Sequence, residues 1–163
     1  GFLEKREFRD TQFVTALLPP GGGYTMVDPR FLSLFNCINV LFPSEENIKT
    51  IYNSILSAHL KAKSFPEDVK ELCKDVTVST YKLFERVCLA LPRSPIKFHY
   101  IFNLRELSKV YQGLLRSTKE MFDTKEKFVR LWKNECCRVF IDRLIAEKDK
   151  DLVLSDTHRV RYT

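Results

Sequence analysis

The chain has 163 residues and a formal net charge of +6, and 44% of its residues are hydrophobic. This length predicts one domain, or one domain with part of another, and the apolar content is enough for a buried core. No window holds the roughly 18 uninterrupted apolar residues of a membrane span. The basic residues alternate with acidic ones, as on an ordinary helical surface. We therefore expect neither a membrane nor a nucleic acid as a partner.

The N-terminal region predicts the edge of a sheet. Its first ten residues, GFLEKREFRD, are charged, begin without Met and lack the apolar run of a signal peptide, so we expect a piece of a longer chain. Residues 10–18 and 36–42 each predict a buried strand. Between them, three glycines at 21–23 predict a flexible loop, and Asp28 caps a short helix that begins with Pro29. No GxxxxGK(S/T) sequence occurs, so this glycine loop is not a P-loop.

A helical pattern begins at Ser44, which is a good N-cap, and continues in four segments. After the helix that Ser44 begins, we expect helices over about 67–91, 103–116 and 125–145. The helix over 67–91 carries a seam of small and apolar residues at helix-packing spacing, namely Val69, Cys73, Val76, Thr80, Leu83, Val87 and Ala90. The polar residues from 147 to 163 predict a linker. The fold class is therefore mostly α, with about four helices preceded by two strands from an α/β subdomain.

The cysteines are five in number and show no CxxC motif or Cys/His spacing of a metal site. Each lies within an apolar pattern, which predicts buried free thiols in a reducing compartment. Cys136 and Cys137 are adjacent and would point about 100° apart on a helix, so they would chelate poorly. We expect no metal ligands in this chain.

Two charged groups could carry chemistry. Arg105 lies in the first turn of the helix over 103–116, where Asn103 and Glu106 have the spacing of a capping box. A cation there opposes the helix dipole at a cost of about 0.3–1 kcal/mol, whereas the free N–H groups of that end suit an anion. Arg105 is therefore either a ligand for a phosphate or a solvated arginine on a polar face.

The second group is a ladder of Glu135, Arg138 and Asp142, in which one arginine can bridge two carboxylates. Paired carboxylates can serve acid–base catalysis, but this arginine would keep both acids ionised. No nucleophile is evident beside them. We therefore expect no catalytic residue and consider the ladder a candidate contact surface.

Five segments together resemble one family. They are LLPPGGG at 17–23, VDPRFLSLFN at 27–36, FPSEENIKTIY at 42–52, HYIFNLRELSKVYQGLLRS at 99–117 and RLWKNECCRVFIDRLI at 130–145. In this order they resemble the dynein heavy chain, specifically the end of the third module in its ring of ATPase domains. The proline pair followed by three glycines is more similar to axonemal dyneins than to the cytoplasmic form.

The resemblance implies a division of the chain into three parts. Residues 1–43 would be the end of a large α/β AAA+ subdomain, residues 44–146 a helical AAA+ lid, and residues 147–163 a linker toward the next module. The P-loop and the acidic motif that holds Mg²⁺ would lie upstream. The fragment alone would then not be an ATPase, although the parent chain would be.

The resemblance also implies roles for single residues. Arg105 matches the lid arginine that senses the terminal phosphates of a nucleotide. Arg30 lies where such modules present an arginine finger to the neighbouring module, although it could equally be a structural partner for an acidic residue. Leu18 stands where active modules place a polar sensor, and Tyr24 where an arginine usually follows the glycines. These departures imply a slow or regulatory nucleotide site.

The function that the resemblance implies is a nucleotide-sensing lid in an ATP-driven, minus-end-directed microtubule motor. Its cofactor would be ATP or ADP, with Mg²⁺ held by upstream residues. Its partners would be neighbouring ATPase modules, and, through the parent protein, microtubules and other dynein chains in the cytoplasmic cytoskeleton and the axoneme of cilia or flagella. Two alternatives remain, a non-enzymatic helical module whose seam at 69–90 binds a partner helix, and a nucleic-acid-binding helical domain.

Overall fold

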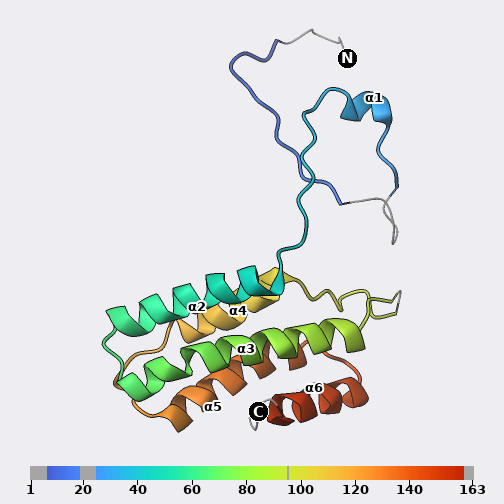
Figure 1. Cartoon of the computed structure of the whole chain (residues 1–163). Helices are drawn as coiled ribbons and strands as arrows, with labels where there is room; N and C mark the ends of the chain where they lie inside the picture. The colour runs from blue at the N-terminus through green and yellow to red at the C-terminus, as the bar shows by residue number, and fades with distance from the viewer. Residues whose placement is uncertain (1–6, 19–24, 95, 160–163) are drawn as a thin grey trace. The chain divides into compact units, whose positions relative to one another are not determined.

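The computed structural model describes residues 7–18, 25–94 and 96–159 (Figure 1). The chain separates into two units, Gly1–Leu41 and Phe42–Thr163. The first unit has one short helix within its described residues, and the second unit is a bundle of helices. The prediction of a mostly helical fold is therefore confirmed.

The described part of the first unit contains helix α1 (Pro29–Leu32) and otherwise irregular backbone. As predicted, Asp28 caps this helix, and its Oδ1 accepts a hydrogen bond of 2.8 Å from the backbone N of Arg30. The strands predicted at 10–18 and 36–42 are not formed in the described residues. A strand needs a neighbour to satisfy its backbone hydrogen bonds and cover its apolar face, and the rest of the predicted sheet is absent from this sequence.

Within residues 42–94 and 96–159, the second unit forms five α-helices and one turn of π-helix. The elements are α2 (Glu45–Ala62), α3 (Glu67–Ala90), α4 (Leu104–Leu114), α5 (Lys125–Cys136), the π-helix η1 (Cys137–Ile141) and α6 (Glu147–Arg159). Helix α2 packs along α3, and α5 packs against both α3 and α4 (Figure 1). Helix α6 contacts α3 and η1. The order and positions of the four predicted helices agree with α2, α3, α4 and α5 with η1.

Side-chain caps explain where these helices begin. Ser44 Oγ accepts a hydrogen bond of 3.3 Å from Asn47 N at the start of α2, as the sequence predicts. Thr124 Oγ1 accepts one of 3.4 Å from Lys127 N at the start of α5. Each cap satisfies a backbone donor that the first helical turn leaves without an internal partner.

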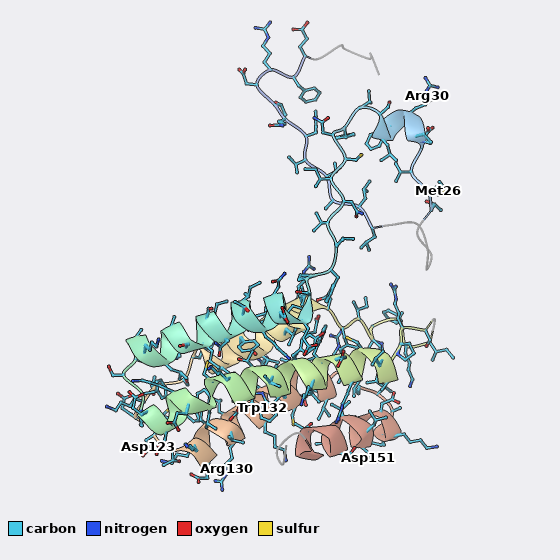
Figure 2. All side chains as sticks on the ribbon, viewed as in Figure 1. Met26, Arg30, Asp123, Arg130, Trp132 and Asp151 are labelled. Atoms are coloured by element: carbon cyan, nitrogen blue, oxygen red, sulfur yellow. The ribbon has the colours of Figure 1, made fainter. Side chains whose placement is uncertain are left out.

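The core of the second unit lies along the predicted seam of α3. Val69, Leu83 and Val87 are at most 1% exposed, and of the seven predicted seam residues only Ala90 is exposed. Trp132 on α5 reaches this seam, where its Nε1 donates a hydrogen bond of 2.8 Å to Thr80 Oγ1 (Figure 2). Burial of these side chains removes apolar area from water and holds α3 and α5 together.

Residues 147–159 form helix α6 rather than the linker predicted from their polar composition. Val153 is 1% exposed, and its carbonyl accepts a hydrogen bond from the buried Thr157 hydroxyl. A single buried edge is enough to dock a helix on an existing core, even when most of its residues are polar. No helix in the described part of the chain is long and apolar enough to cross a bilayer.

Candidate functional site

The start of α4 has the capping box that the sequence predicts. Asn103 Oδ1 accepts a hydrogen bond of 2.8 Å from Arg105 N. In return, Asn103 N donates one of 3.1 Å to Glu106 Oε2. Leu107, Val110 and Leu114 bury the opposite side of the helix, each at most 1% exposed. The first turn of α4 is therefore fixed both by its cap and by the core.

Arg105 projects from this turn and is exposed. Among the described residues, its side chain forms no hydrogen bond or ion pair. The predicted free N–H groups beside it are largely occupied, since the Asn103 side chain accepts from the backbone N of both Arg105 and Glu106. The guanidinium is consequently the group that this end of the helix can offer to an anion. Both interpretations of Arg105, a phosphate ligand and a solvated arginine, are compatible with this geometry.

Helix α2 supports the same turn through a tyrosine. The Tyr52 hydroxyl lies 3.2 Å from Leu104 O and 2.8 Å from Ser108 Oγ. Its ring stacks on Tyr111 with the ring centroids 4.4 Å apart. These contacts attach the first turn of α4 to the bundle on the side of α2.

An unpredicted arginine supports the turn from the other side. Arg143 Nη2 donates a hydrogen bond of 2.7 Å to His99 O, and its Nη1 lies 3.2 Å from Ile101 O and 3.3 Å from Glu106 Oε1. Its guanidinium carbon is 5.3 Å from the centre of the Phe102 ring. The sequence carries no signal for these contacts, because two of the acceptors are backbone carbonyls. They lie about forty residues earlier in the chain, so the contacts close a long loop.

The segment before α4 is also attached to α6. Asp149 Oδ2 accepts hydrogen bonds of 2.5 Å from Lys97 Nζ and 2.9 Å from the Tyr100 hydroxyl. The Tyr100 hydroxyl accepts one of 3.2 Å from Ile145 N. The hydrogen bond from Lys97, with a smaller contribution from Tyr100, holds the pKa of Asp149 below its ordinary value. Helix α6 thus contacts the segment that precedes Arg105.

Arg30, the second predicted site residue, lies on α1 in the other unit and is exposed (Figure 2). Its carbonyl accepts a hydrogen bond of 2.8 Å from the Ser33 hydroxyl. The neighbouring Asp28 accepts a hydrogen bond from the backbone N of Arg30. Leu18 is 64% exposed, and Tyr24 and the glycines at 21–23 lie outside the described residues.

The predicted ladder is half formed. Arg138 Nε and Nη2 donate hydrogen bonds of 2.9 and 2.6 Å to Glu135 Oε2. Within the described residues, Arg138 forms no ion pair with Asp142. Residues 137–141 form a π-turn, in which Asp142 N donates to Cys137 O, so the α-helical spacing on which the prediction depended does not apply. No group of three or more His, Cys, Asp or Glu side chains in the described residues is arranged to hold a metal ion.

Comparison with known families identifies the bundle. The AAA+ lid domain family matches residues 77–161, and the P-loop containing dynein motor region matches residues 2–43. The chain belongs to the AAA+ lid domain family. The match of both regions also confirms the resemblance to the dynein heavy chain and the expected lid fold.

Individual dynein heavy chains are similar over almost all of the lid fragment. Dynein axonemal heavy chain 10 of Homo sapiens is 48% identical over 93% of this chain. The dynein-1-alpha heavy chain of the flagellar inner arm I1 complex of Chlamydomonas reinhardtii is 47% identical over 91%, and dynein axonemal heavy chain 2 of Mus musculus is 42% identical over 93%. The fragment spans 3% of the length of each of these relatives.

Proposed function

We propose that this chain is the nucleotide-sensing lid of one ATPase module, the third in the ring, in an axonemal-type dynein heavy chain. The parent chain binds ATP or ADP with Mg²⁺ held by residues upstream of this fragment. It hydrolyses ATP to move toward microtubule minus ends in the axoneme of cilia or flagella. The similarity to axonemal heavy chains over more than nine tenths of the fragment supports this assignment.

The observation that carries the proposal is the position of Arg105. It presents an exposed guanidinium from a first turn that the cap, α2 and Arg143 hold in place. A guanidinium can bind two phosphate oxygens at once, which makes it well suited to a nucleotide. In our mechanism, Arg105 contacts the phosphates only when the lid closes, and this differential contact shifts the equilibrium toward closure. Because the core unites the helices, the lid moves as one body against neighbouring modules.

The buried seam of α3 argues against the alternative of a helical interaction module. That alternative requires the seam at 69–90 to be available for a partner helix. Val69, Cys73, Val76, Thr80, Leu83 and Val87 are all buried within the bundle. A partner helix would therefore have to displace the lid's own helices.

The role of Arg105 can be tested by nucleotide titration of the parent heavy chain. A hydrogen bond to a charged group contributes about 1.5–3 kcal/mol, so Arg105→Ala should weaken ATP or ADP binding at this module by about 10- to 100-fold. Arg116→Ala is the matched control, since it removes an exposed arginine just after the other end of α4. Equal affinities of the two variants would refute the sensor role.

Arg30 is proposed as a finger toward the neighbouring module's nucleotide, where it would neutralise charge on the transferring phosphoryl group. Arg30→Ala in the parent chain should then slow hydrolysis at the neighbouring module while nucleotide affinity at its own module stays the same. Single-turnover hydrolysis measures this effect. An unchanged rate at the neighbour would leave Arg30 with a structural role.

A further inference from the structure

Arg143 joins three acceptors within residues 99–106, the segment that contains Arg105. It contacts the carbonyls of His99 and Ile101 and the carboxylate of Glu106. Its side chain is 29% exposed, whereas that of Glu106 is 8% exposed. The planar fork of an arginine can hold several acceptors in fixed directions, which a single ammonium group cannot do. Arg143 therefore fixes the shape of this segment as well as balancing a charge.

The Glu106 carboxylate depends on this contact. Apart from Arg143, the one cationic partner of its Oε1 among the described residues is Lys109, at 3.5 Å, and the Lys109 side chain is 57% exposed. A buried carboxylate that loses its main partner is strongly unfavourable, so it tends to move toward water. The backbone N of Asn103 donates a hydrogen bond of 3.1 Å to Glu106 Oε2. Movement of Glu106 would therefore also break this bond of the helix cap.

Three successive contacts therefore connect Arg143 with the proposed sensor. Arg143 Nη1 lies 3.3 Å from Glu106 Oε1, Glu106 Oε2 accepts from Asn103 N, and Asn103 Oδ1 accepts from Arg105 N at 2.8 Å. We infer that Arg143 is a positioning residue that fixes the first turn of α4, from which the Arg105 side chain projects. This inference rests on the proposed sensor role and adds to it a residue that never touches the nucleotide.

The position of Arg143 in the chain connects Arg105 with the junction between η1 and α6. Arg143 lies two residues after η1 ends at Ile141, and α6 begins four residues later, at Glu147. The same junction holds the segment before α4 a second time, through Ile145, Tyr100 and Asp149. Because coupling between two sites is reciprocal, phosphate binding at Arg105 would in turn stabilise the junction between η1 and α6.

The inference is tested by a double-mutant cycle on nucleotide affinity in the parent heavy chain, using ADP as the probe. Arg143→Gln should weaken ADP binding about tenfold when Arg105 is present, within the range of coupled neighbours. It should weaken binding less than about twofold in an Arg105→Ala background, where there is no sensor left to position. Arg116→Gln is the control, because it removes an exposed arginine just after the other end of α4, away from the capping box.

Each outcome decides the matter. An equal loss in both backgrounds, or an equal loss for Arg116→Gln, would mean general damage to the lid and overturn the inference. Full affinity of Arg143→Gln beside a weakened Arg105→Ala would overturn it while leaving the proposed sensor intact. An Arg105→Ala variant with normal affinity would instead remove the sensor itself.

A second variant keeps the test valid if Arg143→Gln fails to fold. Arg143→Lys retains a cation for Glu106 but has no fork to hold the two carbonyls. It should give an intermediate loss of affinity and faster amide exchange over 99–106. Wild-type exchange and affinity in this variant would show that charge alone is sufficient and contradict positioning by the guanidinium.

Discussion

The two units of this chain are similarly rich in apolar side chains but bury them to different extents. In the first unit, Phe13, Val14 and Val40 are 65%, 90% and 84% exposed. In the second, Phe128, Phe140 and Leu83 are 0% exposed. Hydrophobic residues thus do not make a core by themselves; they need surfaces that the same chain can bring against them.

Secondary structure explains which unit can do this. A helix satisfies its backbone hydrogen bonds internally, so the second unit can assemble α2 to α6 from local sequence and then pack them. A strand satisfies them only through another strand. The first unit contains the sequence of two predicted strands, and without a sheet around them its described apolar residues pack only in small groups such as Phe31 with Phe35.

The largest expected effect is on the free energy of unfolding. The same substitution, Phe→Ala, is made in each unit to test this difference directly. Phe128 packs edge-on against Phe65 with centroids 6.2 Å apart, and Phe128→Ala should lower the free energy of unfolding by about 3–5 kcal/mol. Phe13→Ala removes the same ring from an exposed site and should change it by less than about 0.5 kcal/mol. Denaturant unfolding followed by circular dichroism of the 163-residue chain measures both.

A substantial loss for Phe13→Ala would break the comparison. It would mean that the first unit buries this ring and possesses a core of its own. Comparable small losses at both sites would mean that burial of Phe128 does not hold the second unit together.

A smaller expected effect is the loss of stability at alkaline pH through Tyr111. It refines the comparison because Tyr111 belongs to the second unit. Burial, opposed by hydrogen bonds with Thr77 and Thr80, raises the pKa of Tyr111 to about 12. An unfolded tyrosine titrates near about 10, so the folded state keeps its proton longer and stability falls as the pH rises from about 10 to 12. At about 1.4 kcal/mol per unit, the contribution amounts to at most about 2–3 kcal/mol.

Tyr111→Phe should therefore flatten the alkaline loss of stability. The measurement is the urea midpoint of wild type and variant between pH 8 and 12, chosen around the ordinary tyrosine pKa of about 10. Wild type and variant share every other tyrosine, including Tyr24 of the first unit, so the difference between the curves belongs to Tyr111 in the second unit. Parallel curves across this range would show that the Tyr111 hydroxyl is not shielded from water.

Much of the bundle could be predicted because its signals are local. Caps such as Ser44 and the Asn103–Glu106 box depend on residues three positions apart, and the seam of α3 depends on a repeating pattern. The face of α2 was harder, since Ile51 and Ile55 continue the apolar pattern yet are 52% and 42% exposed. Two apolar stripes lie on that helix, and packing against α3 selects the one with Leu56 and Leu60.

The predictions that failed, or were never made, depend on contacts distant in sequence. The polar composition of residues 147–159 hides the single buried edge that holds α6 in place. Arg143 recognises carbonyl groups, which every residue possesses, so no residue pattern identifies it. The roles of Arg105 and Arg30, and the division into subdomains at residues 43 and 146, remain predictions from the family resemblance.

An exposed cysteine in the first unit and a buried tryptophan in the second allow each unit to be followed by its own spectroscopic signal. Cys37 is exposed, whereas burial raises the pKa of the thiols of Cys73, Cys88, Cys136 and Cys137 and so keeps them from reacting as thiolates. Trp132 is the sole tryptophan of the chain and is 4% exposed. A maleimide dye would therefore attach to the first unit, while intrinsic fluorescence follows the second, and the two can be observed independently in one unmodified sequence.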